Sequence, residues 1–161
     1  MPADLHIHTC YSDGLDSPAQ VVGRAKELGL SAISVCDHDC VGGLGEALEA
    51  AQGDLMVITG VEINAEENGA EFHILGYGFP LQAEGLDRLT AWLQQNRLER
   101  LGRFMERLRH YGIEVEAEEV LRAAGAGSVG RPHLAKVLAE KGYAGGVQEA
   151  FKRYLSPGRP T

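Results

Sequence analysis

Hydrophobic and polar residues alternate at the start of the chain, which predicts a β-strand over Asp4–Thr9. Leu5 and Ile7 alternate there with His6 and His8. Because residues two apart in a strand point to the same face, both imidazoles lie opposite the two aliphatic side chains. Neighbouring histidines pack poorly in a core, but each can give a neutral ring nitrogen to one metal ion. The alternative is a pair of partly exposed strand histidines with no ligand role.

The spacing of apolar residues then changes between helical and strand periods. Ser17 and Pro18 predict an N-cap and a first helical turn, and Gly29 predicts the end of that helix. The remaining elements of this half are predicted as strands over 31–36, 55–59 and 71–77 and a helix over 44–51. Alternating strands and helices are typical of an α/β fold with a parallel sheet covered on both faces. Such sheets carry their chemistry at the carboxyl ends of the strands.

The pattern becomes helical from about Glu84 onward. An apolar stripe predicts a long helix that ends near Gly112, and shorter helices are predicted over 116–124, 132–141 and 146–154. Four arginines lie largely on another side of the long helix: Arg97, Arg100, Arg103 and Arg107. They form either a solvated helix face, with glutamates between them, or a rim that faces phosphate.

Composition and charge narrow the class of protein. The 161 residues are 44% hydrophobic and 24% charged, as in a soluble globular protein. No apolar run approaches the length of a membrane span, and no signal peptide is visible, which argues against secretion. Three cysteines without a Cys-x-x-Cys pair fit a reducing cytoplasm. The net charge of −8 argues against broad nucleic-acid binding, but carboxylates that hold cations are compatible with an anionic substrate.

Residues of the metal-ligating types gather in the first half of the chain. The candidates are His6, His8, Asp13, His38, Glu62 and His73, with Asp37 and Asp39 nearby. Imidazole and carboxylate ligands together suit zinc, manganese or iron, and more than four candidates indicate more than one ion. A multi-metal centre orients an attacking hydroxide and neutralises charge on a phosphoryl group. Taken singly, these residues also have ordinary interpretations. Asp39 could be a helix cap, Glu62 a solvated carboxylate, and His73 a core histidine.

Two further motifs carry possible chemistry. Cys36, His38 and Cys40 could belong to a structural zinc site, although the sequence offers no obvious fourth ligand. Arg131 precedes a helix that Pro132 starts, and His133 lies in its first turn. A guanidinium beside a helix N-terminus predicts a phosphate site. The alternative is a plain helix N-terminus after a Gly-rich loop.

Together, these motifs resemble the PHP family, the polymerase and histidinol phosphatase group of metal-dependent phosphoesterases. The matching segments are 4–9 with 12–14, 37–39, 60–63 and 73–76. The Gly-Arg-Pro-His motif at 130–133 and the segment 155–160 resemble the branch that contains nucleoside 3',5'-bisphosphate phosphatases and small-RNA 5'-to-3' exonucleases.

The resemblance implies a distorted, TIM-like (β/α)7 barrel with a helical insertion and up to three divalent metal ions. It divides the chain into half of a barrel (1–83), the insertion (84–155) and the start of a return to the barrel (156–161). The family also has a His-Pro motif and an Asp-x-His pair downstream, and the sequence stops before either of them. The chain therefore resembles the N-terminal part of a longer protein. We expect a dimer or the missing half to cover the open barrel.

The resemblance also assigns roles to individual residues. His6, His8 and Glu62 would bind one ion, Glu62 would bridge to a second ion shared with His73, and Asp13 and His38 would hold a third. Asp13, His38 and Glu62 would be the catalytic set. Arg131 and His133 would contact the substrate phosphate.

The implied reaction is hydrolysis of nucleotide or short-oligonucleotide phosphate esters by a metal-bound hydroxide. Three alternatives remain. One is a histidinol-phosphate phosphatase, and another is an amidohydrolase or deaminase, against which Asp13 and the Asp37-His38 pair argue. The third is a truncated, catalytically weak metal-binding fragment.

Overall fold

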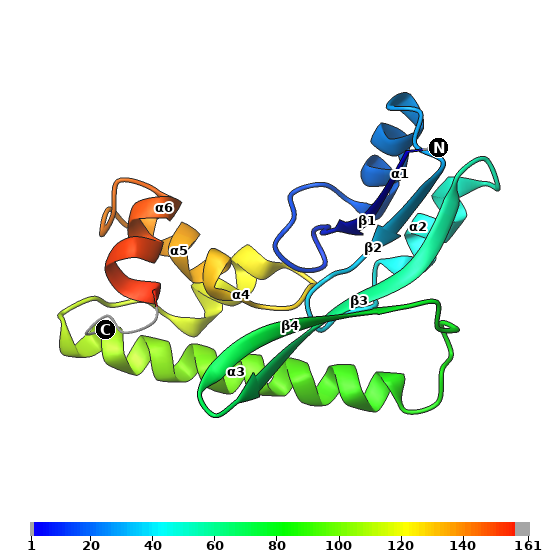
Figure 1. The fold of residues 1–161 in the computed structure, drawn as a ribbon. Coiled ribbons are helices and arrows are strands. Elements are labelled where there is room, and N and C mark those ends of the chain that lie inside the picture. Colours follow the sequence, from blue (N-terminus) through cyan, green and yellow to red (C-terminus); the bar gives the residue numbers. More distant parts are fainter. Residues whose placement is uncertain (1, 157–161) are drawn as a thin grey trace. The chain divides into compact units, whose positions relative to one another are not determined.

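The computed structural model describes residues 2–156, which form two compact units (Figure 1). The first unit comprises residues 2–94 and 126–128, and the second comprises residues 95–125 and 129–156. The barrel and insertion boundaries expected from the sequence stay a prediction. The predicted return segment lies, from residue 157 onward, outside the described residues.

A four-stranded sheet forms the centre of the first unit. Its strands are β1 (Ala3–Ile7), β2 (Ala32–Val35), β3 (Met56–Glu67) and β4 (Ala70–Tyr77), in that spatial order. The first three strands are parallel, as predicted, but β4 runs antiparallel to β3. β3 is also much longer than the predicted 55–59. Both differences come from the tight turn at Asn68 and Gly69, where both residues have positive φ. An Asn-Gly pair is a strong hairpin signal, so the chain reverses direction there.

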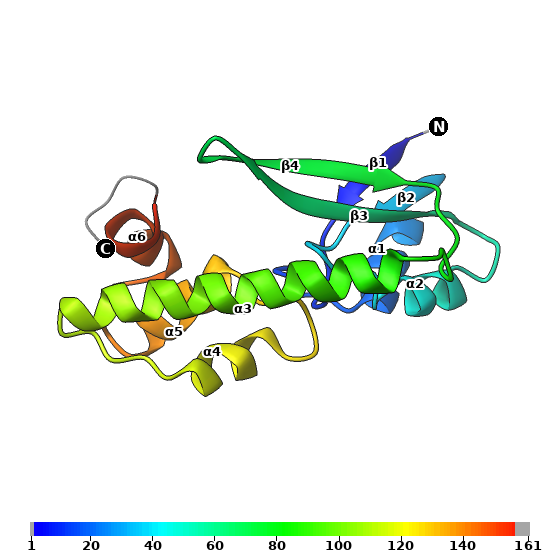
Figure 2. The same ribbon diagram turned by 90° about the horizontal axis from the view of Figure 1, so that it is seen from below.

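Two helices cover one face of this sheet, α1 (Pro18–Glu27) and α2 (Leu44–Ala51) (Figure 2). The predicted start of α1 is confirmed: the Ser17 side chain accepts a hydrogen bond from the Gln20 N–H, and the Gln20 side chain accepts one from the Ser17 N–H. The helices share an apolar core with β2. Four of the five residues of β1 are exposed, so the expected covering of both faces does not extend to that strand.

The second unit consists of helices joined by loops, with no strand among its described residues. It contains the C-terminal part of α3 (Leu86–His110), then α4 (Ala117–Ala124), α5 (Arg131–Glu140), α6 (Val147–Ala150) and a wider π-helical turn, η1 (Phe151–Leu155). Leu108, Leu134, Leu138 and Leu155 are almost fully buried in its core. The helical prediction beyond Glu84 is confirmed here. Within residues 2–156, no helix is both long and apolar enough to cross a membrane.

We expect Gly60→Ala to lower the free energy of unfolding by about 2 kcal/mol. A Cβ at Gly60 would overlap the Ser34 hydroxyl and lie 2.6 Å from Cys36 Sγ and 2.7 Å from the Val35 carbonyl oxygen. Urea denaturation measures the change. The matched control is Gly45→Ala in α2, where a Cβ has no neighbour within 4 Å. That variant should be as stable as the parent or more stable by up to about 1 kcal/mol. Equal effects at both positions would contradict the packing described at Gly60.

Candidate metal centre

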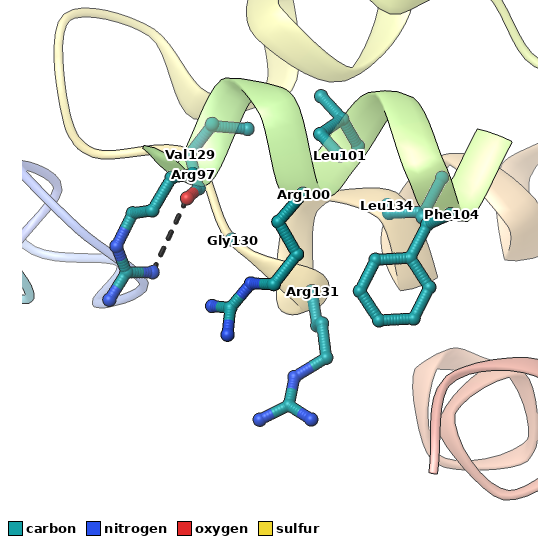
Figure 3. Close-up of a pocket in the computed structure, with 8 residues that line it drawn as sticks. All are labelled: Arg97, Arg100, Leu101, Phe104, Val129, Gly130, Arg131 and Leu134. Atoms are coloured by element: carbon teal, nitrogen blue, oxygen red, sulfur yellow. Dashed lines mark hydrogen bonds between the residues drawn. The ribbon is translucent and has the colours of Figure 1, made fainter. Parts of the chain in front are cut away.

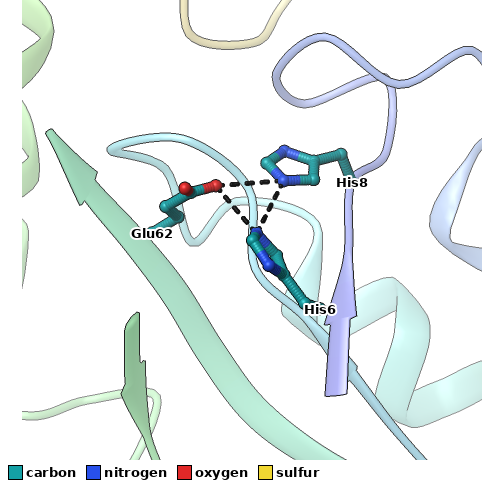
Figure 4. A group of neighbouring side chains, drawn as sticks. All are labelled: His6, His8 and Glu62. Carbon is teal, nitrogen blue, oxygen red and sulfur yellow. Dashed lines mark hydrogen bonds and ion pairs between the residues drawn. The ribbon is translucent and has the colours of Figure 1, made fainter. Parts of the chain in front are cut away.

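His6, His8 and Glu62 meet at the surface of the sheet (Figure 4). His6 lies in β1, and His8 is the first residue after that strand. Glu62 lies inside β3 rather than at a strand end. One carboxylate oxygen, Glu62 Oε2, lies 3.0 Å from the Nε2 atoms of both histidines. The two Nε2 atoms are 3.1 Å apart. The prediction that both imidazoles share one face of the first strand is therefore confirmed.

Two further groups extend this cluster within the first unit. Asp13 lies 3.1 Å from His8 Nδ1 and 3.9 Å from His38 Nε2. Glu62 lies 3.4 Å from His38 Nδ1 through Oε2, and 2.7 Å from His73 Nδ1 through Oε1. All six predicted ligands therefore lie together, in three overlapping groups that share His8, His38 and Glu62.

The donor atoms of this cluster suit bound cations. Two ligands that each lie about 2.1 Å from one ion are separated by no more than about 4.2 Å. The nitrogen–oxygen distances described above, 2.7 to 3.9 Å, lie within that limit. Neutral imidazoles have one lone pair each, so a cation would satisfy nitrogens that otherwise face one another, as those of His6 and His8 do.

Both carboxylates of the cluster are held in the ionised form. Burial opposes ionisation of Glu62, but the His6 hydrogen bond and the charges of His38, His73 and His8 lower its pKa. Burial likewise opposes ionisation of Asp13, but the hydrogen bond from His8 and the charge of His38 hold its pKa well below the usual range. The same hydrogen bond raises the pKa of His8. Ionised carboxylates are the form that binds metal ions, whereas the histidine charges belong to protonated imidazoles, whose protons a bound cation would displace.

Asp37 is hydrogen-bonded to the loop between His8 and Asp13 and belongs to none of the three ligand groups. It is buried, and it accepts hydrogen bonds from the Thr9 N–H (2.7 Å), the Thr9 hydroxyl (2.6 Å) and the Ser12 hydroxyl (2.6 Å). These bonds fix the loop between His8 and Asp13. Sequence reasoning missed this role, although two hydroxyl residues between two candidate ligands were a usable signal.

Asp39 fixes a second loop beside the centre. Its backbone has a positive φ of 52°, and its carboxylate accepts a hydrogen bond from the Asn64 N–H at 2.9 Å. The Asp39 N–H donates to the Glu62 carbonyl at 2.9 Å. The aspartate therefore ties the loop after β2 to the part of β3 that carries Glu62. The helix-cap alternative for Asp39 is replaced by this link between loop and strand.

The rival zinc site at Cys36 and Cys40 has no support in the described residues. Both cysteines are buried, and none of the candidate ligand groups found among residues 2–156 includes a cysteine. Cys36 Sγ lies 3.4 Å from the Leu5 carbonyl oxygen. Burial raises the pKa of both thiols, which favours the protonated form that does not bind metal.

Arg131 and His133 lie in the second unit, where Arg131 begins α5. His133 is buried, and its Nδ1 accepts a hydrogen bond from the Gly130 N–H at 3.0 Å. That nitrogen therefore caps the helix and is not available to a ligand. The role of both residues in binding a substrate phosphate stays a prediction.

Comparison with known proteins gives a consistent picture. The family model described as the PHP domain matches residues 4–157. A 5'-3' exoribonuclease from Haemophilus influenzae is 36% identical over 160 residues, which cover 97% of this chain and 57% of the relative. A 3',5'-nucleoside bisphosphate phosphatase from Chromobacterium violaceum is 32% identical over 159 residues, covering 98% of this chain and 56% of the relative.

A solved structure shows the same similarity in three dimensions. The structure of a protein assigned as a metal-dependent phosphoesterase, from Bifidobacterium adolescentis, has a TM-score of 0.87 and 31% sequence identity. The match covers 97% of this chain and 56% of that one. The chain thus spans little more than half the length of the relatives it matches.

Proposed function

Because the chain belongs to the PHP domain family, we propose that it is the metal-binding part of a phosphoesterase that acts on nucleotides or short oligonucleotides. One observation carries the proposal: the side chains of four histidines converge on Glu62, and two of those histidines, His8 and His38, also contact Asp13. The hydrolase class follows from the family, and the similarity to an exoribonuclease and to a nucleoside bisphosphate phosphatase supports a nucleotide substrate.

Different residues of the cluster would bind different ions. Glu62 presents Oε2 to His6 and His8, and Oε1 to His73, which supports the proposal that its carboxylate would contribute to two ion sites. Asp13 and His38 would hold a third. Bound manganese, zinc or iron would supply an activated water as nucleophile and neutralise charge on the phosphoryl group.

The rest of the chain would keep these ligands in position. Asp37 keeps the loop that carries Asp13 in place, and β1 and β3 provide rigid backbone for His6 and Glu62. Arg131 and His133, through the atoms that do not cap α5, are proposed to bind a phosphate of the substrate.

The length of the relatives supports a second candidate. This chain covers 57% and 56% of the two relatives described above. The alternative, a catalytically weak metal-binding fragment, would bind metal weakly and turn over slowly. A closed (β/α)7 barrel, its covering by a dimer or by further polypeptide, and a cytoplasmic location stay predictions.

Release of phosphate tests the proposal. The chain is stripped with a chelator, reloaded with Mn²⁺ and incubated with adenosine 3',5'-bisphosphate and, separately, with histidinol phosphate. We expect metal-dependent release from the bisphosphate that is absent in Glu62→Gln. A metal-loaded chain that releases nothing would support the fragment alternative, and preferential release from histidinol phosphate would overturn the nucleotide assignment.

A further inference from the structure

The first strand is irregular in the stretch that carries His6. Asp4 pairs with Ile33 of β2. Three residues further along β1, Ile7 pairs with Val35, which lies only two residues beyond Ile33. β1 therefore has one residue more than β2 over this stretch, which is the pattern of a β-bulge. Such bulges are found next to active sites, where they change the direction of a side chain.

This bulge decides which face of the sheet the histidines occupy. The β2 residues that pair with Asp4 and Ile7 are buried against α1 and α2, so these two residues of β1 lie on the side of the helices. In a strand without the extra residue, every second position after Asp4 would share that side, including His6 and His8. The bulge reverses the alternation, and both imidazoles instead lie beside Glu62.

Side chains hold the peptide bond between Leu5 and His6 at both of its polar groups. The Leu5 carbonyl accepts a hydrogen bond from the Tyr77 hydroxyl at 2.8 Å and a weaker one from the Cys36 thiol at 3.4 Å. The His6 N–H donates to the Asp4 carboxylate at 3.2 Å. The peptide is planar, so these bonds restrict the direction in which the His6 side chain leaves the backbone.

The Tyr77 bond connects the two outer strands of the sheet. Tyr77 lies in β4 and Leu5 in β1, with β2 and β3 between them. In a flat sheet, β1 and β4 would be about 14 Å apart, so a direct bond requires the sheet to curve. Gly60 pairs with Tyr77 and has no side chain that would obstruct the phenol on that face of β3. The bond therefore fixes the bulge relative to β4, the strand that carries His73.

We propose that Tyr77 is a positioning residue of the metal centre. Through the Leu5 carbonyl, its hydroxyl holds the bulge in the conformation that presents His6 to Glu62. His6 Nε2 lies 3.0 Å from Glu62 Oε2, and a rotation of the Leu5–His6 peptide would separate these two atoms. The inference rests on the proposed function, because it concerns an ion that these ligands would bind.

Calorimetric titration of metal-stripped protein with Mn²⁺ tests the role of Tyr77. We expect Tyr77→Phe, which keeps the ring and removes only the hydroxyl, to weaken binding about tenfold, because residues that orient a ligand contribute about 10- to 100-fold to metal affinity. In a His6→Ala background the same substitution should change the affinity less than about twofold, because its effect passes through His6. Losses of equal size in both backgrounds would contradict the proposal.

Tyr154→Phe is the matched control. The Tyr154 hydroxyl donates to the Tyr143 carbonyl at 3.1 Å within the second unit, so this variant also loses a bond from a phenol to a backbone carbonyl. Tyr154 is not a candidate metal ligand, and it does not line the depression of the second unit that contains Arg131 (Figure 3). Tyr154→Phe should lower the midpoint of urea unfolding, as Tyr77→Phe does, but bind Mn²⁺ with the affinity of the parent.

Parent and variant together distinguish the metal centre from the role of Tyr77. A parent chain that binds no Mn²⁺ would overturn the metal centre, and the positioning role with it. A parent that binds Mn²⁺ with the same affinity as Tyr77→Phe would overturn the positioning role alone and leave the metal centre in place. Equal losses of affinity in Tyr77→Phe and Tyr154→Phe would also overturn the positioning role, because a general loss of stability would then explain both.

Discussion

The variant Glu62→Gln should lower the affinity of the chain for Mn²⁺ by about 100-fold or more. Replacing a residue that only supports a ligand already costs about 10- to 100-fold, and Glu62 is central to the cluster itself. Its two oxygens lie within 3.4 Å of His6, His8, His38 and His73. The amide keeps the shape of the side chain but removes the charge, so two of the three ligand groups lose their anion.

Calorimetric titration with Mn²⁺, on protein from which a chelator has removed bound metal, measures this change in affinity. The matched control is Glu66→Gln, an exposed carboxylate four residues along the same strand, which should bind Mn²⁺ as the parent does. A Glu62→Gln variant that keeps the parent affinity would show that the ions, if bound, lie elsewhere.

Asp37→Ala should destabilise the first unit by about 3 kcal/mol. The aspartate is 1% exposed and accepts three hydrogen bonds of 2.6 to 2.7 Å. Hydrogen bonds to a charged group contribute about 1.5–3 kcal/mol each, and the buried hydroxyls of Thr9 and Ser12 would lose their acceptor. We therefore expect a lower urea midpoint together with weaker Mn²⁺ binding, because the loop that carries Asp13 loses its anchor.

The control for Asp37 is Asp54→Ala. The Asp54 side chain is exposed and forms a long ion pair with Lys26, at 3.7 Å, so its loss should change stability by less than about 0.5 kcal/mol. If Asp37→Ala were as stable as Asp54→Ala, the buried carboxylate would not hold the loop as described.

Local signals were sufficient to predict most elements of the fold. The Ser17 and Pro18 signals placed the start of α1, and the predicted helix over 44–51 coincides with α2. The prediction was wrong about the length of β3 and the direction of β4. Asn68 and Gly69 form a hairpin between these strands, which the alternation of strands and helices did not indicate. Strand direction depends on such turns, which hydrophobic spacing alone does not reveal.

The sequence selected the six side chains that the structure brings together, while their role as metal ligands stays a prediction. Strand alternation placed His6 and His8 on one face, and side-chain type added Glu62. The supporting bonds of Asp37 join residues 25 and 28 positions apart, and no local pattern reports such pairing. The use of His133 Nδ1 as a helix cap is a similar case, since the sequence shows the residue but not which of its atoms is occupied.

The most direct test of the metal centre is an anomalous-scattering map of crystals of this chain grown with Mn²⁺. We expect peaks within about 2.0–2.3 Å of the Nε2 atoms of His6 and His8 and of a Glu62 oxygen, with further peaks beside Asp13 and His38 or beside His73. Peaks only at other carboxylates, or none in this cluster at saturating Mn²⁺, would contradict the assignment of these residues as metal ligands.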